Sequence, residues 1–140
     1  MADSIDKKIA QFKQEAGNKE QYNTEQQKIY SAFTKKNGSK TTINVVDCEG
    51  VRIRVILNSS DEVRKKLLKH YKGTKGTVTA KEILNMFDIV RSGSKNFNDG
   101  NYVYIKRYRR RGTVYFTVLK LFSDGETAVL KSFYSNVGYK

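Results

Sequence analysis

The sequence predicts an α+β fold in which a helical N-terminal arm precedes helices packed on an antiparallel β-meander. Two changes of pattern predict it: apolar residues have helical spacing before residue 35 and alternate with polar residues after residue 42. Two turn signals, Arg111-Gly112 and Asp124-Gly125, then divide the C-terminal part into three expected strands. A chain of 140 residues is long enough for one domain with a core of ordinary size.

The first 40 residues differ in composition from the rest. They are rich in Gln, Lys, Glu and Asn, have apolar residues at helical spacing on both sides of Gly17-Asn18, and end in a polar run. We therefore divide the chain into a helical arm or adaptor with its linker, residues 1–40, and a domain, residues 41–140. The pattern leaves open whether the arm packs on the domain or only tethers it.

The domain is expected to begin with a β-hairpin, residues 42–47 and 52–57, that turns at Glu49-Gly50. Ser59-Ser60-Asp61 is expected to cap a helix that runs to about Tyr71, and Thr77 or Thr79 to cap a second helix. The remaining strands are expected at residues 102–109, 113–121 and 127–134. Helices followed by a meander predict that the helices cover one face of the sheet.

The chain carries 27 Lys and Arg residues against 14 Asp and Glu residues, a net charge of +13, and most of the excess lies after residue 42. Such an excess favours polyanionic partners, nucleic acid before an acidic protein. Cys48 is the only cysteine and His70 the only histidine. The sequence therefore excludes an intrachain disulfide, metal sites that need several of these residues, and catalysis by a pair of histidines. We expect neither a membrane span nor a Sec signal peptide.

The expected strand 102–109 combines tyrosines with positive charge. One face is predicted to carry Tyr102, Tyr104, Lys106 and Tyr108, and the other Val103, Ile105, Arg107 and Arg109, before Arg110 and Arg111 extend the basic run. Basic residues interleaved with aromatic rings are typical of a surface that follows phosphates and stacks bases. The same residues also fit a solvated hairpin rim, where charge prevents edge pairing.

His70 is the side chain best suited to proton transfer near neutral pH. Helical geometry places it on the same side as Val63 and Leu67, toward the sheet. It fits a catalytic acid or base, and it also fits a histidine at the edge of the core whose ring is satisfied by a backbone carbonyl.

On the last expected strand, a period of two puts Ser132 and Tyr134 on one face and Lys131 and Phe133 on the other. Two hydroxyls at this spacing can hold a phosphate. An aromatic residue near a strand end also commonly packs on a helix.

From about Ile53 to Asn136, the order of these features resembles the phage and polymorphic-toxin nucleases of the barnase, EndoU, colicin and RelE-like (BECR) class. In that class a helix ends in a catalytic His, a Thr opens a second helix, a connector follows, and a three-strand meander ends in Ser/Thr-x-Tyr. The matching segments are Leu67-Leu68-Lys69-His70, Val78-Thr79-Ala80-Lys81-Glu82-Ile83-Leu84, Asp88-Ile89-Val90-Arg91-Ser92-Gly93, Tyr102-Val103-Tyr104-Ile105-Lys106, Tyr115-Phe116-Thr117-Val118-Leu119-Lys120 and Leu130-Lys131-Ser132-Phe133-Tyr134. EndoU members use two histidines, so this chain is closer to the colicin-like branch.

The resemblance implies a BECR-like RNase fold and a metal-independent endoribonuclease without a cofactor, with tRNA the favoured substrate. It implies that His70 acts as acid or base, with Ser132 and Tyr134 as companions. Lys106 and Lys120 are expected to stabilise charge on the phosphate as a 2'-hydroxyl attacks it and a 2',3'-cyclic phosphate forms. Residues expected to contact RNA are Arg91, Tyr104, Arg107, Tyr108, Arg109, Arg110, Arg111 and Lys131.

The resemblance also implies a monomeric toxin domain that acts in the cytoplasm of a target bacterium, reaches it by a route not visible in the sequence, and is neutralised by an acidic immunity or antitoxin protein. Three other functions stay open. A metal-dependent nuclease would need clustered carboxylates, and those after residue 42 are scattered. A non-catalytic basic nucleic-acid-binding protein, or a phage structural protein that contacts the genome or a neighbouring subunit, would use the same positive charge.

Overall fold

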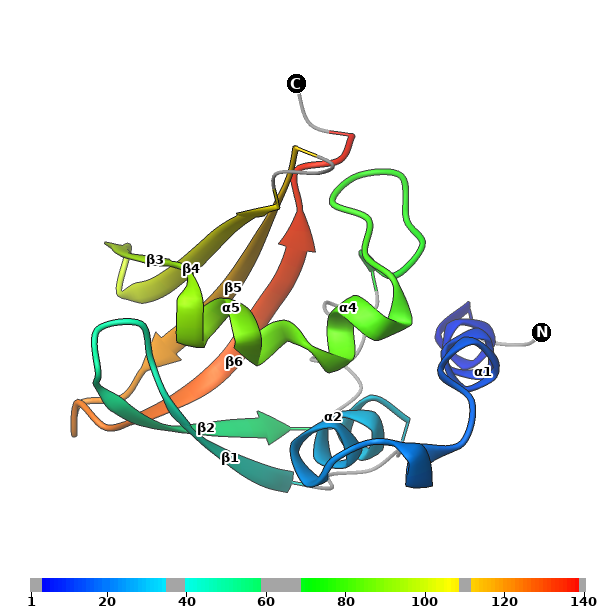
Figure 1. Cartoon of the computed structure of the whole chain (residues 1–140), viewed down its shortest axis with the longest axis horizontal. Helices are drawn as coiled ribbons and strands as arrows, with labels where there is room; N and C mark the ends of the chain where they lie inside the picture. Colours follow the sequence, from blue (N-terminus) through cyan, green and yellow to red (C-terminus); the bar gives the residue numbers. More distant parts are fainter. Residues whose placement is uncertain (1–3, 35–39, 59–68, 109–111, 139–140) are drawn as a thin grey trace.

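The computed structural model describes residues 4–34, 40–58, 69–108 and 112–138. Six strands form one sheet in the order β1-β2-β6-β5-β4-β3. Their bounds are β1 Lys40–Val46, β2 Arg52–Asn58, β3 Ser94–Asn98, β4 Asn101–Tyr108, β5 Thr113–Leu121 and β6 Thr127–Ser135. Helices α4 (Ala80–Leu84) and α5 (Met86–Ser92) lie across one face of the sheet (Figure 1). The mixed α+β class is confirmed.

The expected strands form, and the sheet contains one strand more. β1 and β2 make the predicted hairpin, and β4, β5 and β6 make an antiparallel meander. β2 joins the meander through parallel pairing with β6. The prediction that a connector follows the second helix is wrong. Residues 89–92 are the last turn of α5, and β3 follows Gly93 as an added edge strand. β3 lacks the apolar alternation that would predict it, because four of its five side chains are exposed.

The second predicted helix begins as expected. Thr79 caps α4 in a capping box with Glu82, which satisfies two backbone N–H groups that the first helical turn leaves unpaired. The helix expected from residue 59 falls mostly outside the described residues. Its expected last residues, 69–71, form a turn and a bridge between Tyr71 and Val78.

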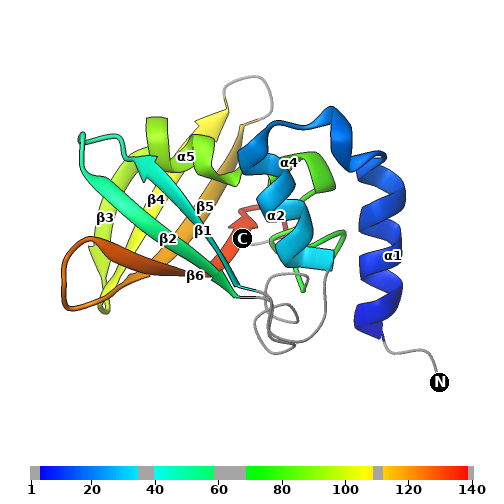
Figure 2. The same cartoon turned by 90° about the horizontal axis from the view of Figure 1, so that it is seen from below.

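The N-terminal segment is helical, as predicted, and it packs into the core. Helix α1 (Ser4–Ala16), a 3-10 turn (Lys19–Gln21) and helix α2 (Thr24–Thr34) follow one another, and Figure 2 shows α2 between α1 and the sheet. Phe12 and Ile29 are completely buried in the same hydrophobic cluster as the sheet residues. These two helices therefore help to hold the sheet.

A β-bulge interrupts β6. Val118 of β5 pairs with Ser132 but Leu119 pairs with Leu130, so Lys131 is an extra residue in the register. Lys131 is exposed whereas Phe133 is buried. The prediction that these two side chains share a face is therefore wrong, because the bulge breaks strict alternation at this point.

Candidate active site around His70

The imidazole of His70 lies against the ring of Tyr134, and their ring centroids are 5.4 Å apart. Tyr134 in turn stacks on Phe116 of the neighbouring strand β5, with centroids 4.9 Å apart. All three side chains are partly exposed, and Phe116 and Tyr134 are directly paired across the sheet. The fold thus brings together two residues, distant in the sequence, that were predicted to act in catalysis.

Backbone hydrogen bonds fasten the loop that carries His70 to the end of β6 (Figure 1). Val78 N donates to the carbonyl of His70 at 2.9 Å, which closes the loop on itself. Gly76 N donates to the carbonyl of Val137 at 2.7 Å, and Ser135 N donates to the carbonyl of Gly76 at 3.2 Å. The loop therefore continues the pairing of β6 beyond the short stretch that β2 covers.

One ring nitrogen of His70 has a defined partner. Nδ1 lies 2.9 Å from the carbonyl oxygen of Lys75. A carbonyl only accepts hydrogen bonds, so this contact requires the proton on Nδ1 and leaves a lone pair on Nε2 of the neutral ring. Among the described residues, none is hydrogen-bonded to Nε2. A hydrogen bond from Nδ1 to a backbone carbonyl is expected of a structural histidine. The same bond also sets the tautomer that a general base needs, with its lone pair on Nε2.

Gly76 packs against the ring of His70 and the Cβ of Tyr134. Its φ is +68°, a region that side-chain-bearing residues rarely adopt. A Cβ built here would lie 2.8 Å from Nδ1 of His70 and 3.1 Å from Cβ of Tyr134. The close approach of the loop to the two rings requires glycine at this position.

Helix α1 supports the residues on both sides of His70. Lys8 Nζ donates to the carbonyl oxygens of Lys69 and Tyr71, at 3.2 and 3.0 Å. The Tyr71 side chain is fully buried, and its ring lies edge-on to Phe12 with centroids 5.7 Å apart. Removing α1 would therefore remove the support of the candidate site.

Ser132 lies on the same face as Tyr134, two positions earlier on β6, and is partly exposed. The two lysines predicted to stabilise the phosphate lie elsewhere. Lys106 Nζ donates to Ser92 Oγ of α5 at 2.8 Å, on the other side of the sheet. Lys120 pairs with Val129 near the start of β6, away from Tyr134. The loop that carries His70 has two lysines that the sequence did not single out: Lys72 pairs with Glu15 of α1 at 3.2 Å, and Lys75 is exposed.

Two residues predicted to contact nucleic acid have structural roles. Tyr104 is fully buried and donates its hydroxyl to Asp47 Oδ2 at 2.8 Å, so its ring is not available to stack on a base. Arg91 pairs with Glu25 of α2 and Asp88 of α5. The hydrogen bond with Glu25 raises the pKa of Arg91 above its usual value, and burial offsets only part of this increase.

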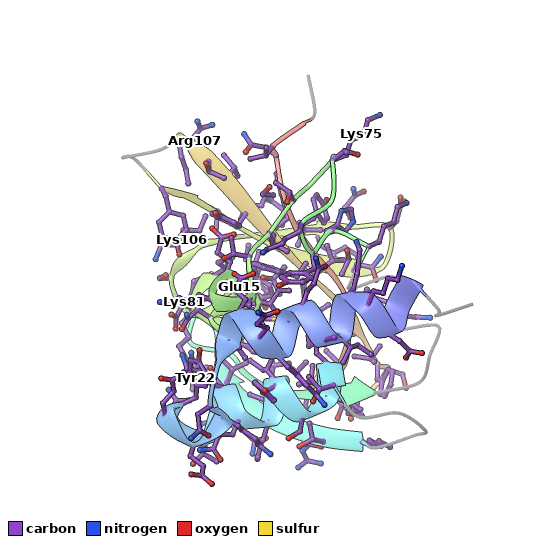
Figure 3. The ribbon with its side chains drawn as sticks, turned by 90° about the vertical axis from the view of Figure 1, so that its right-hand side faces the viewer. Glu15, Tyr22, Lys75, Lys81, Lys106 and Arg107 are labelled. Carbon is purple, nitrogen blue, oxygen red and sulfur yellow. The ribbon has the colours of Figure 1, made fainter. Side chains whose placement is uncertain are left out.

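The other predicted contacts are exposed or undescribed. Arg107 and Lys131 are exposed, and Tyr108 is 39% exposed. Arg109, Arg110 and Arg111 lie outside the described residues. Figure 3 shows that Arg107 and Lys75 both lie at the upper end of the molecule.

A cleft of about 560 Å³ on the helix side of the sheet was not predicted. Tyr108, Tyr115 and Phe133 form aromatic walls, and Lys81, Glu82 and Asp88 from α4 and α5 form its polar rim. The tyrosines of β4 were visible in the sequence. The cleft was not, because it depends on how the two short helices cross the end of β5.

Comparisons with known protein families, with curated proteins and with solved structures found no match. No helix within the described ranges is long and apolar enough to cross a membrane. The described side chains include no group of three His, Cys, Asp or Glu residues placed to hold a metal ion. Any assignment of function therefore depends on the chemistry of the side chains themselves.

Proposed function

We propose that this protein is a metal-independent endoribonuclease in which His70 acts as the general base. The observation that carries the proposal is the contact of the His70 and Tyr134 rings, with Nδ1 of His70 held by a backbone carbonyl and Nε2 left as an acceptor. RNA supplies its own nucleophile, the 2'-hydroxyl, so one positioned base and a cationic environment are sufficient for cleavage.

In the proposed reaction, Nε2 of His70 takes the proton of a 2'-hydroxyl while its oxygen attacks the adjacent phosphorus. The bond between phosphorus and the 5'-oxygen breaks, and a 2',3'-cyclic phosphate forms. The departing 5'-oxygen takes a proton from the imidazolium or from water. A positioned base of this kind typically contributes about 100 to 10,000-fold to the rate.

Positive charge near His70 suits the phosphate. The net charge of +13 attracts RNA as a whole, and Lys75 lies in the same loop as His70, whereas Lys72 of that loop is paired with Glu15. Arg107 extends the positive charge at that end of the molecule (Figure 3). In this proposal the hydroxyl of Ser132, on the face that carries Tyr134, donates to a phosphate oxygen.

We extend the proposal to the resemblance to BECR nucleases because Tyr134, near the end of the meander, lies against His70. On that basis the proposal extends to tRNA as the substrate. It also extends to a monomeric toxin that acts in the cytoplasm of a target bacterium and is neutralised by an acidic immunity protein.

The decisive experiment incubates total RNA with the protein in excess EDTA and identifies the new RNA ends. The wild-type chain is compared with His70→Ala and with Lys13→Ala, a control on the exposed face of α1. We expect 2',3'-cyclic phosphate ends from the wild type and Lys13→Ala, and intact RNA with His70→Ala.

Two results would contradict the proposal. Equal cleavage by folded His70→Ala would exclude His70 as the base. Intact RNA with folded wild-type protein, together with a gel shift of the RNA, would indicate the non-catalytic binder instead.

A further inference from the structure

The cleft on the helix side of the sheet has planar aromatic walls. The rings of Tyr108 and Tyr115 meet at 85° with centroids 5.3 Å apart, and Tyr115 stacks on Phe133 at 6.0 Å. Tyr108 remains 39% exposed although it lines the cleft. Tyr115 and Phe133 are only 7% and 2% exposed, so Tyr108 is the member of this group that offers an exposed ring, the kind of surface on which proteins stack unpaired bases.

One carboxylate oxygen in the cleft remains as an acceptor. Both oxygens of Glu82 are engaged, by Thr79 N and by the Tyr115 hydroxyl. Asp88 Oδ1 pairs with Arg91 at 3.1 Å, and no hydrogen bond to Oδ2 is found among the described residues. The Asp88 side chain is 54% exposed. The cleft can therefore accept a hydrogen bond from a bound group through Asp88.

The hydroxyl of Tyr108 lies near the same carboxylates. Burial raises the pKa of Tyr108, and the negative charges of Asp88 and then Glu82 raise it further. The hydroxyl therefore stays protonated and is a donor beside the Asp88 acceptor. A base stacked on the Tyr108 ring lies in a plane parallel to that ring, so the in-plane hydroxyl of Tyr108 does not reach the edge of the base, and Asp88 remains as the acceptor for that edge.

Two lysines add positive charge at this cleft. Lys81 lines the cleft, and Lys106 Nζ lies 5.2 Å from the centroid of the Tyr108 ring. Figure 3 shows Lys81, Lys106 and Arg107 along one side of the molecule. A cationic side chain of a partner protein would be repelled by these lysines. A planar ring with an amino group, attached to a phosphate, matches the stacking walls, the acceptor and the cations together.

We propose that this cleft binds one unstacked nucleobase that carries an exocyclic amino group, adenine, guanine or cytosine, stacked on Tyr108 and donating to Asp88. This assignment names the substrate feature for the proposed ribonuclease and rests on that function. Phe133 of the cleft and Tyr134 of the candidate active site are neighbours on β6. Because consecutive side chains of a strand point to opposite faces, the cleft and His70 lie on opposite sides of the sheet, and RNA bound at both would pass round the end of β6.

The test titrates 5'-AMP, 5'-GMP, 5'-CMP and 5'-UMP into the isotope-labelled full chain and follows its NMR spectrum. We expect the three amino-bearing nucleotides to shift the signals of Tyr108 and Asp88, and UMP to bind at least about fivefold more weakly. Tyr108→Ala and Asp88→Asn should each weaken binding at least about fivefold, because stacking and a charge-assisted hydrogen bond are each worth at least about 1 kcal/mol.

Asp99→Asn is the matched control. It removes the same charge from an exposed turn whose φ of +50° asparagine adopts readily, so binding should stay within about twofold. Equal affinity for all four nucleotides, or binding that neither cleft variant weakens, overturns the inference.

The two proposals fail separately, because 5'-monophosphates contain no internucleotide bond to cleave. RNA cleavage without nucleotide shifts at the cleft overturns the base site alone. Nucleotide binding by a chain that leaves RNA intact overturns the ribonuclease alone. His70→Ala should abolish cleavage and keep nucleotide binding within about twofold.

Discussion

The Tyr71 hydroxyl donates to Glu15 Oε1 at 2.7 Å and so ties the residue next to His70 to helix α1. Oε2 of the same carboxylate accepts from Ala80 N at the start of α4, at 3.0 Å. Burial raises the pKa of Glu15, but the hydrogen bonds from Tyr71 and Ala80 together lower it below its usual value. The pKa of Tyr71 is raised, first by burial and then by Glu15. One ionised carboxylate therefore joins three elements around the candidate site.

Tyr71→Phe removes the hydroxyl and keeps the buried ring. A hydrogen bond to a charged group contributes about 1.5–3 kcal/mol, so the free energy of unfolding should fall by about that amount in a urea titration. RNA cleavage should fall as well, because residue 71, next to His70, would no longer be hydrogen-bonded to Glu15 of α1. Tyr30→Phe, whose hydroxyl makes only a 3.4 Å contact with Gly17, is the control. Equal stability of the two variants would contradict the role assigned to Glu15.

A buried ion pair holds the other side of the fold. Asp47 and Lys95 are 2.8 Å apart with side chains 0% and 8% exposed. Asp47 Oδ1 also accepts from the backbone N–H groups of Glu49 and Val51, each at 2.9 Å. Burial raises the pKa of Asp47, but the bond from Lys95 and those from the backbone and Tyr104 lower it below the usual range. The pair joins the β1–β2 turn to β3 and β4.

Asp47→Asn should destabilise the protein by up to about 3–5 kcal/mol at pH 7, because it leaves the buried Lys95 ammonium with only the exposed carboxylate of Glu49, 3.5 Å away, as its counter-charge. The folded-state pKa of Asp47 is lowered, so its stabilisation is complete above the ordinary aspartate pKa of about 4 and is lost as the pH falls through the folded value. The difference between wild type and Asp47→Asn in urea titrations should therefore shrink below pH 4. A difference that is constant with pH would contradict this, and Asp99→Asn serves as the charge control.

Most of the secondary structure followed from local patterns, and the exceptions have physical causes. The hairpin at Glu49-Gly50 and the cap at Thr79 were predictable because turns and caps depend on a few adjacent residues. Strand β3 was not, because an edge strand with exposed polar side chains needs no apolar alternation. The position of Lys131 was missed because a bulge adds a residue without any signature in the sequence.

The candidate site was predictable only in part. Residue type and order selected His70 and Tyr134, but their contact depends on a loop that closes on the end of β6. The charge run around Lys106 looked like one surface. In the structure Tyr104 is buried and donates its hydroxyl to Asp47, and Lys106 donates to Ser92. Both side chains lie on the face of the sheet that the helices cover.

Gly76→Ala tests the packing of the loop against the two rings. The added methyl would meet Nδ1 of His70 at 2.8 Å, so we expect the imidazole to move and RNA cleavage to fall at least about tenfold, the loss expected when a base is misplaced. Gly125→Ala is the matched control, since Gly125 also has a positive φ, +74°, but has no atom within 4 Å of the added carbon. Both variants should lose similar stability from backbone strain, about 1 kcal/mol. Equal cleavage by the two variants would show that Gly76 is required only for its positive φ and not for its close contact with His70.

Salt dependence separates phosphate contacts from the general effect of net charge. Each protein cation that neutralises a phosphate of single-stranded RNA contributes about 0.7 to the slope of log affinity against log salt concentration. Lys75 lies in the His70 loop and Arg107 at the same end of the molecule (Figure 3), so Lys75→Ala and Arg107→Ala should each reduce the slope by about that amount. Lys13→Ala removes the same charge from an exposed position of α1, outside the His70 loop and β4, and should leave the slope unchanged. The measurement is fluorescence anisotropy of a labelled RNA with the His70→Ala protein, which prevents cleavage during the titration. If all three variants lower the slope equally, RNA binding depends on the net charge of the protein as a whole. The cations near His70 then do not hold the reacting phosphate.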